Sequence, residues 1–199
     1  MSYLLNKDVF FGDAKAVAGM ALSGEAGDGE SGGFLWGQSL PWSRSLALVS
    51  YVRPEQVSQP VADDALLPAA RENLAVILQY VQAHPDMEFT FYLVPYSILF
   101  WDQTIRTGRL DAVLAMHKLV LEALTALPNA RVFYFLDSYD IITDLDNYGD
   151  HIHFSPHISA LLAERMAAEA PMEASEISAR LTALRVFAEG YDYEAIFAG

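Results

Sequence analysis

The chain has 199 residues, 53% of them hydrophobic, which is enough for one domain that buries roughly 70% of its unfolded surface and excludes an intrinsically disordered protein. The formal net charge of −14 opposes binding to nucleic-acid phosphates or anionic membrane surfaces. The absence of cysteine excludes disulfides, thiolate metal ligands and a cysteine nucleophile.

The N-terminal part of the sequence carries little regular pattern. No apolar run reaches the roughly 18 residues of a membrane-spanning helix. The start, MSYLLNKDVFFGD, has no basic segment followed by an apolar run, so it does not resemble a secretory signal and favours the cytoplasm. If the chain is a fragment of a longer precursor, an envelope or periplasmic location is expected instead. Residues 23–33, SGEAGDGESGG, predict a mobile loop.

The middle of the chain contains the first regular elements. Residues 45–52, SLALVSYV, predict a β-strand. Apolar residues at helical spacing predict a helix over about 66–83. The segment MEFTFYLVPYS, residues 87–97, is aromatic and β-branched and predicts a buried strand that stops at Pro95.

The second half repeats this alternation. A helix is predicted over about 110–127, and RVFYFLD, residues 131–137, predicts a second buried strand. Ser155 and Pro156 have the residue types of an N-cap and a first helical turn. Residues 174–199 are expected to form a C-terminal helical extension that either packs on the domain or forms a dimer seam.

Helices that alternate with continuous apolar strands predict an α/β fold. The expected architecture is a three-layer α/β/α domain with a mainly parallel sheet. Ligands of such sheets bind at the carboxyl ends of the strands. Tyr96 and Ser97 after one strand, Asp137 after the other, and the turn 150–153 are therefore the candidates for a substrate-binding rim.

The strongest chemical signal is the pair Asp150 and His153. A carboxylate three residues before an imidazole accepts from one ring nitrogen and holds the ring in one tautomer. Such a pair is the base half of a nucleophilic triad, in which histidine takes a hydroxyl proton and the acid orients it. The alternative is structural, because Asp, His and Ser gather at helix entrances as caps and Asp150 then serves only the turn.

The segment DHIHFSP, residues 150–156, resembles the last conserved block of the SGNH/GDSL hydrolase superfamily. It is most similar to the D-x-x-H-[FY]-S-P form of bacterial SGNH-like envelope proteins, such as the D-alanyl-lipoteichoic acid transfer protein and polysaccharide O-acetylation proteins. The resemblance covers about residues 88–170, including FYLVPYSILFW. It implies a flavodoxin-like α/β/α fold and a Ser-His-Asp site for acyl-ester hydrolysis or transfer without a metal or other cofactor. His153 is then the general base and Asp150 its orienting acid.

The sequence departs from the superfamily at the nucleophile. The family's Gly-Asp-Ser turn is absent, and the nearest string, Gly12-Asp13-Ala14, has alanine at the nucleophile position. Either residues 1–199 are one complete, catalytically inactive SGNH-like domain, or they are the C-terminal part of a longer one whose serine lies upstream. The second is preferred, because Val9-Phe10-Phe11 is short for a central strand. The family's oxyanion donors are also missing, a loss that costs roughly 3 kcal/mol of transition-state stabilisation.

No other serine is predicted to replace the nucleophile. Ser97 and Ser138 follow the two strands, but neither has the glycine-flanked sharp turn that exposes a nucleophilic hydroxyl. A hydroxyl that satisfies a backbone group at a strand end is the ordinary role of a residue such as Ser97.

Three functions remain open from the sequence. The first is a hydrolase-related domain that acts on a small-molecule or polysaccharide acyl ester. The second is a non-catalytic binding or assembly module with the same fold, associated with an upstream domain or a second copy. The third is a metal-dependent hydrolase, although no established metal-binding spacing is present. Its ligands would come from three histidines and three nearby aspartates: His151, His153, His157, Asp144, Asp146 and Asp150.

Overall fold

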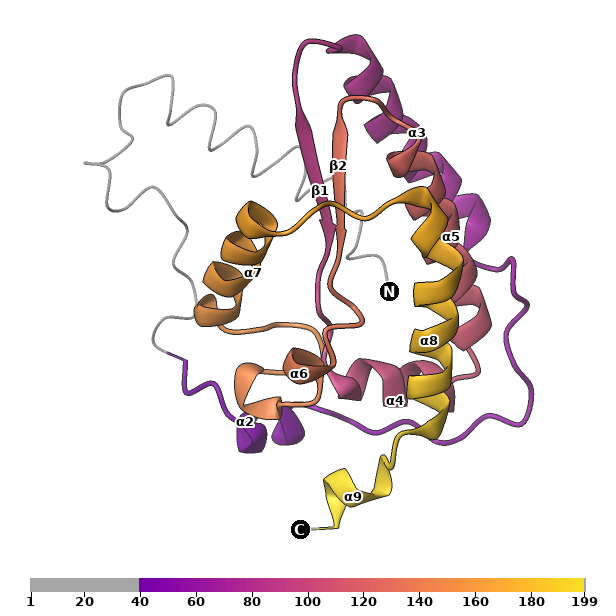
Figure 1. The fold of residues 1–199 in the computed structure, drawn as a ribbon. Coiled ribbons are helices and arrows are strands. Elements are labelled where there is room, and N and C mark those ends of the chain that lie inside the picture. The colour runs from indigo at the N-terminus through magenta and orange to yellow at the C-terminus, as the bar shows by residue number, and fades with distance from the viewer. Residues whose placement is uncertain (1–39, 199) are drawn as a thin grey trace, which may run out of the picture. The chain divides into compact units, whose positions relative to one another are not determined.

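The computed structural model describes residues 40–198. The predicted loop 23–33, the string Gly12-Asp13-Ala14 and the apolar segment Val9-Phe10-Phe11 lie outside the described residues. The described elements follow in the order α2 (Arg44–Val49), α3 (Leu67–Ala83), β1 (Phe89–Leu93), α4 (Ile98–Arg106), α5 (Leu110–Thr125), β2 (Ala130–Tyr134), α6 (Tyr139–Ile142), the 3-10 helix η2 (Leu145–Asn147), α7 (Pro156–Ala168), the 3-10 helix η3 (Ala174–Glu176), α8 (Ile177–Gly190) and α9 (Glu194–Phe197) (Figure 1). Within residues 40–198, none of these helices has the length and apolar character needed to cross a membrane.

The two strands run parallel, as the alternation of helices and strands predicts. Their register pairs Phe89 with Ala130 and Leu93 with Tyr134, and the Phe135 N–H extends the ladder by donating to the Leu93 carbonyl at 2.9 Å. The sheet of the described residues has two strands. The α/β character is therefore confirmed, with a smaller sheet in this part of the chain than the sequence predicts.

Helices lie on both sides of the strands. Figure 1 shows α3, α5 and α8 on one side and α7 on the other, and α5 packs against α3, α8 and β2. Val132 and Tyr134 of β2 are buried together with Leu121 of α5 and Leu184 of α8. Each such side chain contributes about 1.5–3 kcal/mol of hydrophobic stabilisation, so this interface forms the main core. The C-terminal helix α8 thus packs on the domain, which is one of the two arrangements expected for the extension.

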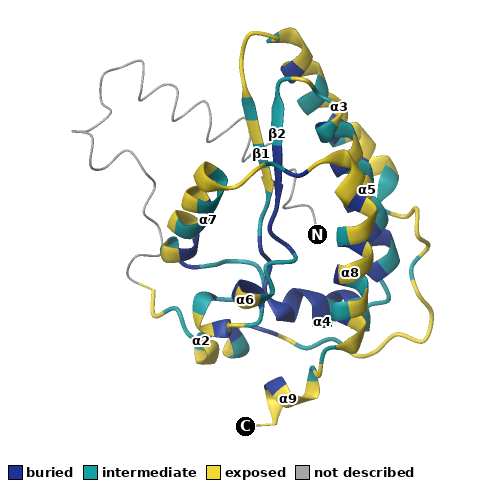
Figure 2. Ribbon diagram, in the orientation of Figure 1, coloured by how far each residue is buried: buried dark blue, intermediate teal, exposed yellow. Residues whose placement is uncertain are grey.

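The helix α4 was not predicted, although a larger share of its residues is buried than in any other helix of residues 40–198. Six of its nine residues are buried, and Figure 2 shows it as a dark segment below the strands. Its sequence, ILFWDQTIR, has nine residues, which is shorter than the roughly 11–18 residues over which a helical apolar period is recognised in a sequence. Ser97 is its N-cap residue, directly after the chain leaves β1.

The strand predicted at 45–52 is wrong. Residues Arg44–Val49 form α2, and the Ser43 hydroxyl caps this helix by accepting from the Leu46 N–H at 3.2 Å. Val49 and Val52 are more than four-fifths exposed, so neither is covered by a sheet neighbour. A short apolar run fits a helix and a strand equally well, and the N-cap decides it here.

The remaining predicted elements are present with shifted ends. The strand expected over 87–97 is β1, but it is not buried as predicted, because Thr90 and Tyr92 are exposed and its other three residues are only partly buried. The helix expected over 66–83 is α3, the helix expected over 110–127 is α5, and the strand expected over 131–137 is β2. Ser155 is the N-cap residue of α7 and Pro156 its first residue, as predicted, although the Ser155 side chain makes no capping hydrogen bond.

Candidate functional site

The predicted Asp-x-x-His segment forms a closed turn between η2 and α7. Tyr148 and Phe154 pair as an antiparallel bridge, and the Gly149 N–H donates to the His153 carbonyl at 3.0 Å. The buried Tyr148 hydroxyl donates to the Pro95 carbonyl at 2.6 Å, which fastens the turn to the chain after β1. These bonds fix both ends of the turn without using the side chains of Asp150 or His153.

Gly149 is required where Trp42 crosses the turn. A Cβ atom added to Gly149 would lie 2.9 Å from a ring carbon of the Trp42 indole. Any larger residue would therefore displace either the indole or the turn. Sequence reasoning did not identify this contact, and the only signal was a glycine directly before Asp150.

Asp150 uses both carboxylate oxygens within the turn. Its Oδ1 accepts from the backbone N–H groups of Ile152 and His153 at 2.8 and 2.7 Å, and its Oδ2 lies 2.6 Å from His153 Nδ1. Burial acts to raise the pKa of Asp150, but the hydrogen bonds from the His153 ring and from the two backbone groups outweigh it. The pKa falls from 3.8 to about 2, so the carboxylate is ionised at neutral pH.

His153 is held in the geometry that general-base chemistry needs. When the neutral ring donates its Nδ1 proton to Asp150, Nε2 becomes the basic nitrogen. The hydrogen bond to Asp150 raises the pKa of His153 above 6.5, against the smaller opposite effect of burial. The side chain is 40% exposed, so the ring is not enclosed in the interior. The structure thus brings together the two residues that the sequence assigned as base and orienting acid.

The turn is also held by the buried residue Ser97. The His151 carbonyl accepts from the Ser97 N–H at 3.2 Å and from the Ser97 hydroxyl at 3.0 Å. Ser97 has no exposed surface, so it supports the turn from the interior and does not line its exposed side. The His151 ring is half-buried, and burial lowers its pKa below 6.5, so His151 is neutral at pH 7.

The other two candidate rim residues lie away from the turn's hydrogen bonds. Tyr96 is buried with its ring 4.7 Å from that of Phe100, and burial raises its pKa to about 12. Asp137 forms a bidentate ion pair with Arg180, whose Nε and Nη2 each lie 2.7 Å from a carboxylate oxygen. The three predicted rim residues therefore do not form one surface.

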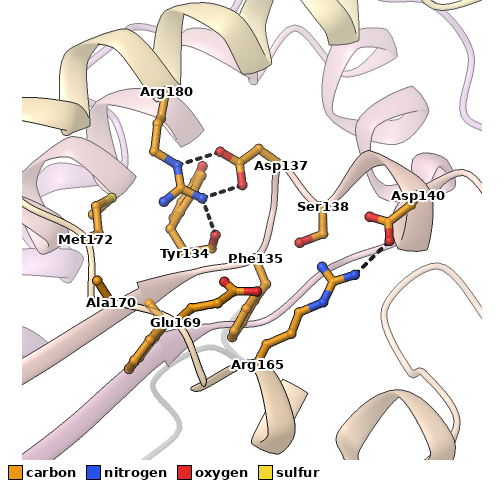
Figure 3. Close-up of a pocket in the computed structure, with 11 residues that line it drawn as sticks. Tyr134, Phe135, Asp137, Ser138, Asp140, Arg165, Glu169, Ala170, Met172 and Arg180 are labelled. Atoms are coloured by element: carbon orange, nitrogen blue, oxygen red, sulfur yellow. Dashed lines mark hydrogen bonds and ion pairs between the residues drawn. The ribbon is translucent and has the colours of Figure 1, made fainter. Parts of the chain in front are cut away.

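Asp137 instead lines a separate polar cavity at the carboxyl end of β2. Its volume is about 350 Å³. Figure 3 shows the Arg180–Asp137 pair on one side and Arg165, bonded to Asp140 at 2.7 Å, on the other. The side chain of Glu169 also points into this space (Figure 3). Because the guanidinium groups already pair with carboxylates, this cavity carries no excess positive charge for an anion.

Two other kinds of site find no support in residues 40–198. No three His, Cys, Asp or Glu side chains of this part of the chain converge as ligands for a metal ion. The metal-hydrolase alternative therefore has no ligand set there. The same residues contain no serine next to a glycine, so the glycine-flanked nucleophile of the SGNH pattern is not among them.

Comparisons with known proteins add no relative. No protein-family model matches the chain, and no curated protein or solved structure matches it either. The SGNH/GDSL resemblance therefore stays a prediction from the DHIHFSP segment, and the function is inferred from the geometry of the turn.

Proposed function

We propose that this chain carries the general-base half of a Ser-His-Asp site that hydrolyses or transfers an acyl ester. The observation behind the proposal is the 2.6 Å contact between His153 Nδ1 and Asp150 Oδ2 in a turn whose backbone is already closed. A carboxylate that served only the turn would need only Oδ1, which accepts both backbone N–H groups. The second oxygen is directed at the ring, and this is the arrangement that orients a catalytic imidazole.

The proposed chemistry follows from the geometry of the Asp150–His153 pair. His153 Nε2 takes the proton of a nucleophilic hydroxyl as that oxygen attacks the ester carbonyl, and the imidazolium is stabilised by the ionised Asp150. The same proton passes to the leaving alkoxide when the carbonyl reforms. Water, or the hydroxyl of an acceptor molecule, then releases the acyl group by the same two proton transfers. The nucleophilic hydroxyl is supplied from outside residues 40–198.

The proposal extends to the fold and the substrate class. Two parallel strands with helices on both sides support a three-layer, flavodoxin-like α/β/α domain in which the turn 150–153 lies beyond the strand ends. The substrate is an acyl ester of a small molecule or a polysaccharide, and no cofactor takes part. The partly exposed His153 ring gives such a substrate access.

The proposal is tested by hydrolysis of p-nitrophenyl acetate, an activated ester that a positioned imidazole cleaves slowly without a serine. Turnover by the purified chain is compared with that of His153→Ala and of His157→Ala, an exposed histidine in the first turn of α7. We expect His153→Ala to remove most of the turnover and His157→Ala to leave it unchanged. Equal turnover by the chain and by His153→Ala excludes His153 as the base.

A further inference from the structure

Asp102 is a buried carboxylate that the catalytic proposal does not use. It lies on α4 and is 1% exposed. It accepts from the Tyr51 hydroxyl at 2.9 Å and from Arg53 through Nε at 2.9 Å and Nη2 at 3.1 Å. A buried charge is costly unless it is paired and hydrogen-bonded, so Tyr51 and Arg53 are held in place by Asp102.

Arg53 continues this network to the C-terminal helix α9. Its guanidinium also forms two bonds to Glu194, at 2.9 Å to Oε2 and 2.8 Å to Oε1. The same group lies 4.5 Å from the centre of the Phe197 ring, within the range of a cation–π contact. The first and last residues of α9 are thus both fixed on Arg53.

Tyr51 connects the network to the turn that holds His153. One neighbour of the Tyr51 ring is Phe197, stacked at 6.3 Å with an interplanar angle of 22°. The other is His151, at 6.1 Å. The carbonyl of His151 accepts the hydrogen bond from the hydroxyl of Ser97, the N-cap residue of α4. The helix α4 therefore contacts the turn twice, directly through Ser97 and indirectly through Asp102 and Tyr51.

We infer that Tyr51, Arg53, Asp102, Glu194 and Phe197, which we name the C-terminal clamp, position the Asp150–His153 pair by packing Tyr51 against His151. The inference rests on the proposed function, since it names how that same site is held. The members of the clamp are positioning residues, because they act on the Asp150–His153 pair (the dyad) only through the contact of Tyr51 with His151. A displacement of about 1 Å at a reacting group costs roughly 100-fold in rate, so a second layer of support has a direct effect on chemistry.

A clamp that only stabilised the fold would leave the dyad itself unchanged. The readout is therefore the His153 Nδ1 proton, whose downfield NMR signal reports the hydrogen bond to Asp150 and whose exchange with water reports opening of the turn. Phe197→Ala removes the ring that backs Tyr51. Val186→Ala is the matched control, because Val186 is an exposed apolar residue on α8. Loss of an aromatic pair of this kind should make proton exchange roughly three- to tenfold faster in Phe197→Ala. The exchange rate in Val186→Ala should equal that of the unsubstituted chain.

Two further variants keep the test decisive if Phe197→Ala folds poorly. Glu194→Gln retains the shape of an exposed side chain and weakens the ion pair with Arg53. Ser97→Ala removes the hydroxyl bonded to the His151 carbonyl, with Ser159→Ala as an exposed serine control. Both are expected to speed exchange of the His153 proton. An unchanged signal and exchange rate in both Phe197→Ala and Glu194→Gln overturns the clamp whatever the effect of Ser97→Ala, because Ser97 contacts His151 directly and is not a member of the clamp.

The same spectra separate this inference from the proposed function. A downfield His153 signal that responds to the clamp, in a chain without His153-dependent ester hydrolysis, supports the clamp and contradicts the catalytic role. Ring ¹⁵N shifts that show neutral His153 without a proton on Nδ1 in the unsubstituted chain contradict the Asp150–His153 pair, and with it the proposed function and the clamp together.

Discussion

Replacing Asp150 by asparagine separates the two roles of its carboxylate. The amide oxygen of Asp150→Asn can still accept from the backbone N–H groups of Ile152 and His153, which bond to Oδ1. The second position becomes an NH₂ group, which donates and cannot accept from His153 Nδ1. The turn therefore keeps its backbone bonds while the ring loses its acceptor.

The expected effect on His153 follows from the causes of its pKa shift. The hydrogen bond to Asp150 is the largest of these and raises the pKa, whereas burial lowers it. Without the carboxylate only burial remains, so the pKa of His153 in Asp150→Asn should fall below 6.5. The shift of Asp150 from 3.8 to about 2 corresponds to about 2 kcal/mol. Partial exposure of the pair reduces the net loss of unfolding free energy at pH 7 to about 1 kcal/mol.

The pH dependence gives this prediction a sign. Because the folded pKa of Asp150 is depressed, its contribution is present above pH 3.8 and is lost as the pH falls through about 2. The contribution of His153 is present below pH 6.5 and is lost as the pH rises through its higher folded pKa. NMR titration of His153 and urea unfolding at pH 7 measure both effects. A His153 pKa that stays above 6.5 in Asp150→Asn refutes the reasoning.

Three other substitutions test the surroundings. Gly149→Ala places a methyl group against Trp42 and is expected to reduce His153-dependent ester hydrolysis at least about tenfold. Unchanged turnover shows that the Trp42 side chain moves aside without displacing the turn. Arg180→Ala leaves Asp137, 12% exposed, without its partner and should lower the unfolding free energy by about 2 kcal/mol in urea; a loss below about 0.5 kcal/mol contradicts the pairing. Burial lowers the pKa of His117 to about 4, so the free energy of unfolding should fall by roughly 3 kcal/mol as the pH falls from 6.5 to 4. His117→Gln should remove this pH dependence. An unchanged pH dependence in the variant shows that another group causes it.

The predictions that succeed depend on neighbours in the sequence. The helices α3 and α5 show an apolar period, and the parallel strands are rich in aromatic and other apolar residues. Asp150 and His153 are three residues apart, so their contact follows from one turn of backbone. Patterns of this kind are visible because cause and effect lie within a few positions.

The features that were missed depend on distant contacts. The bond from Tyr51 to Asp102 spans 51 residues and the bond from Arg53 to Glu194 spans 141, so no local pattern announces them. The same holds for the burial of Ser97, whose partner His151 is 54 residues away. The strand predicted at 45–52 failed for a different reason, because a helix cap at Ser43 outweighs a weak strand preference.

The most direct measurement is the pH–rate profile of ester hydrolysis by the unsubstituted chain, recorded beside the NMR titration of His153. The His153-dependent rate should rise with pH as the ring loses its proton, with a midpoint that lies above pH 6.5 and equals the NMR pKa of His153. A rate that does not follow the titration of this ring, or that persists in His153→Ala, contradicts its role as the base.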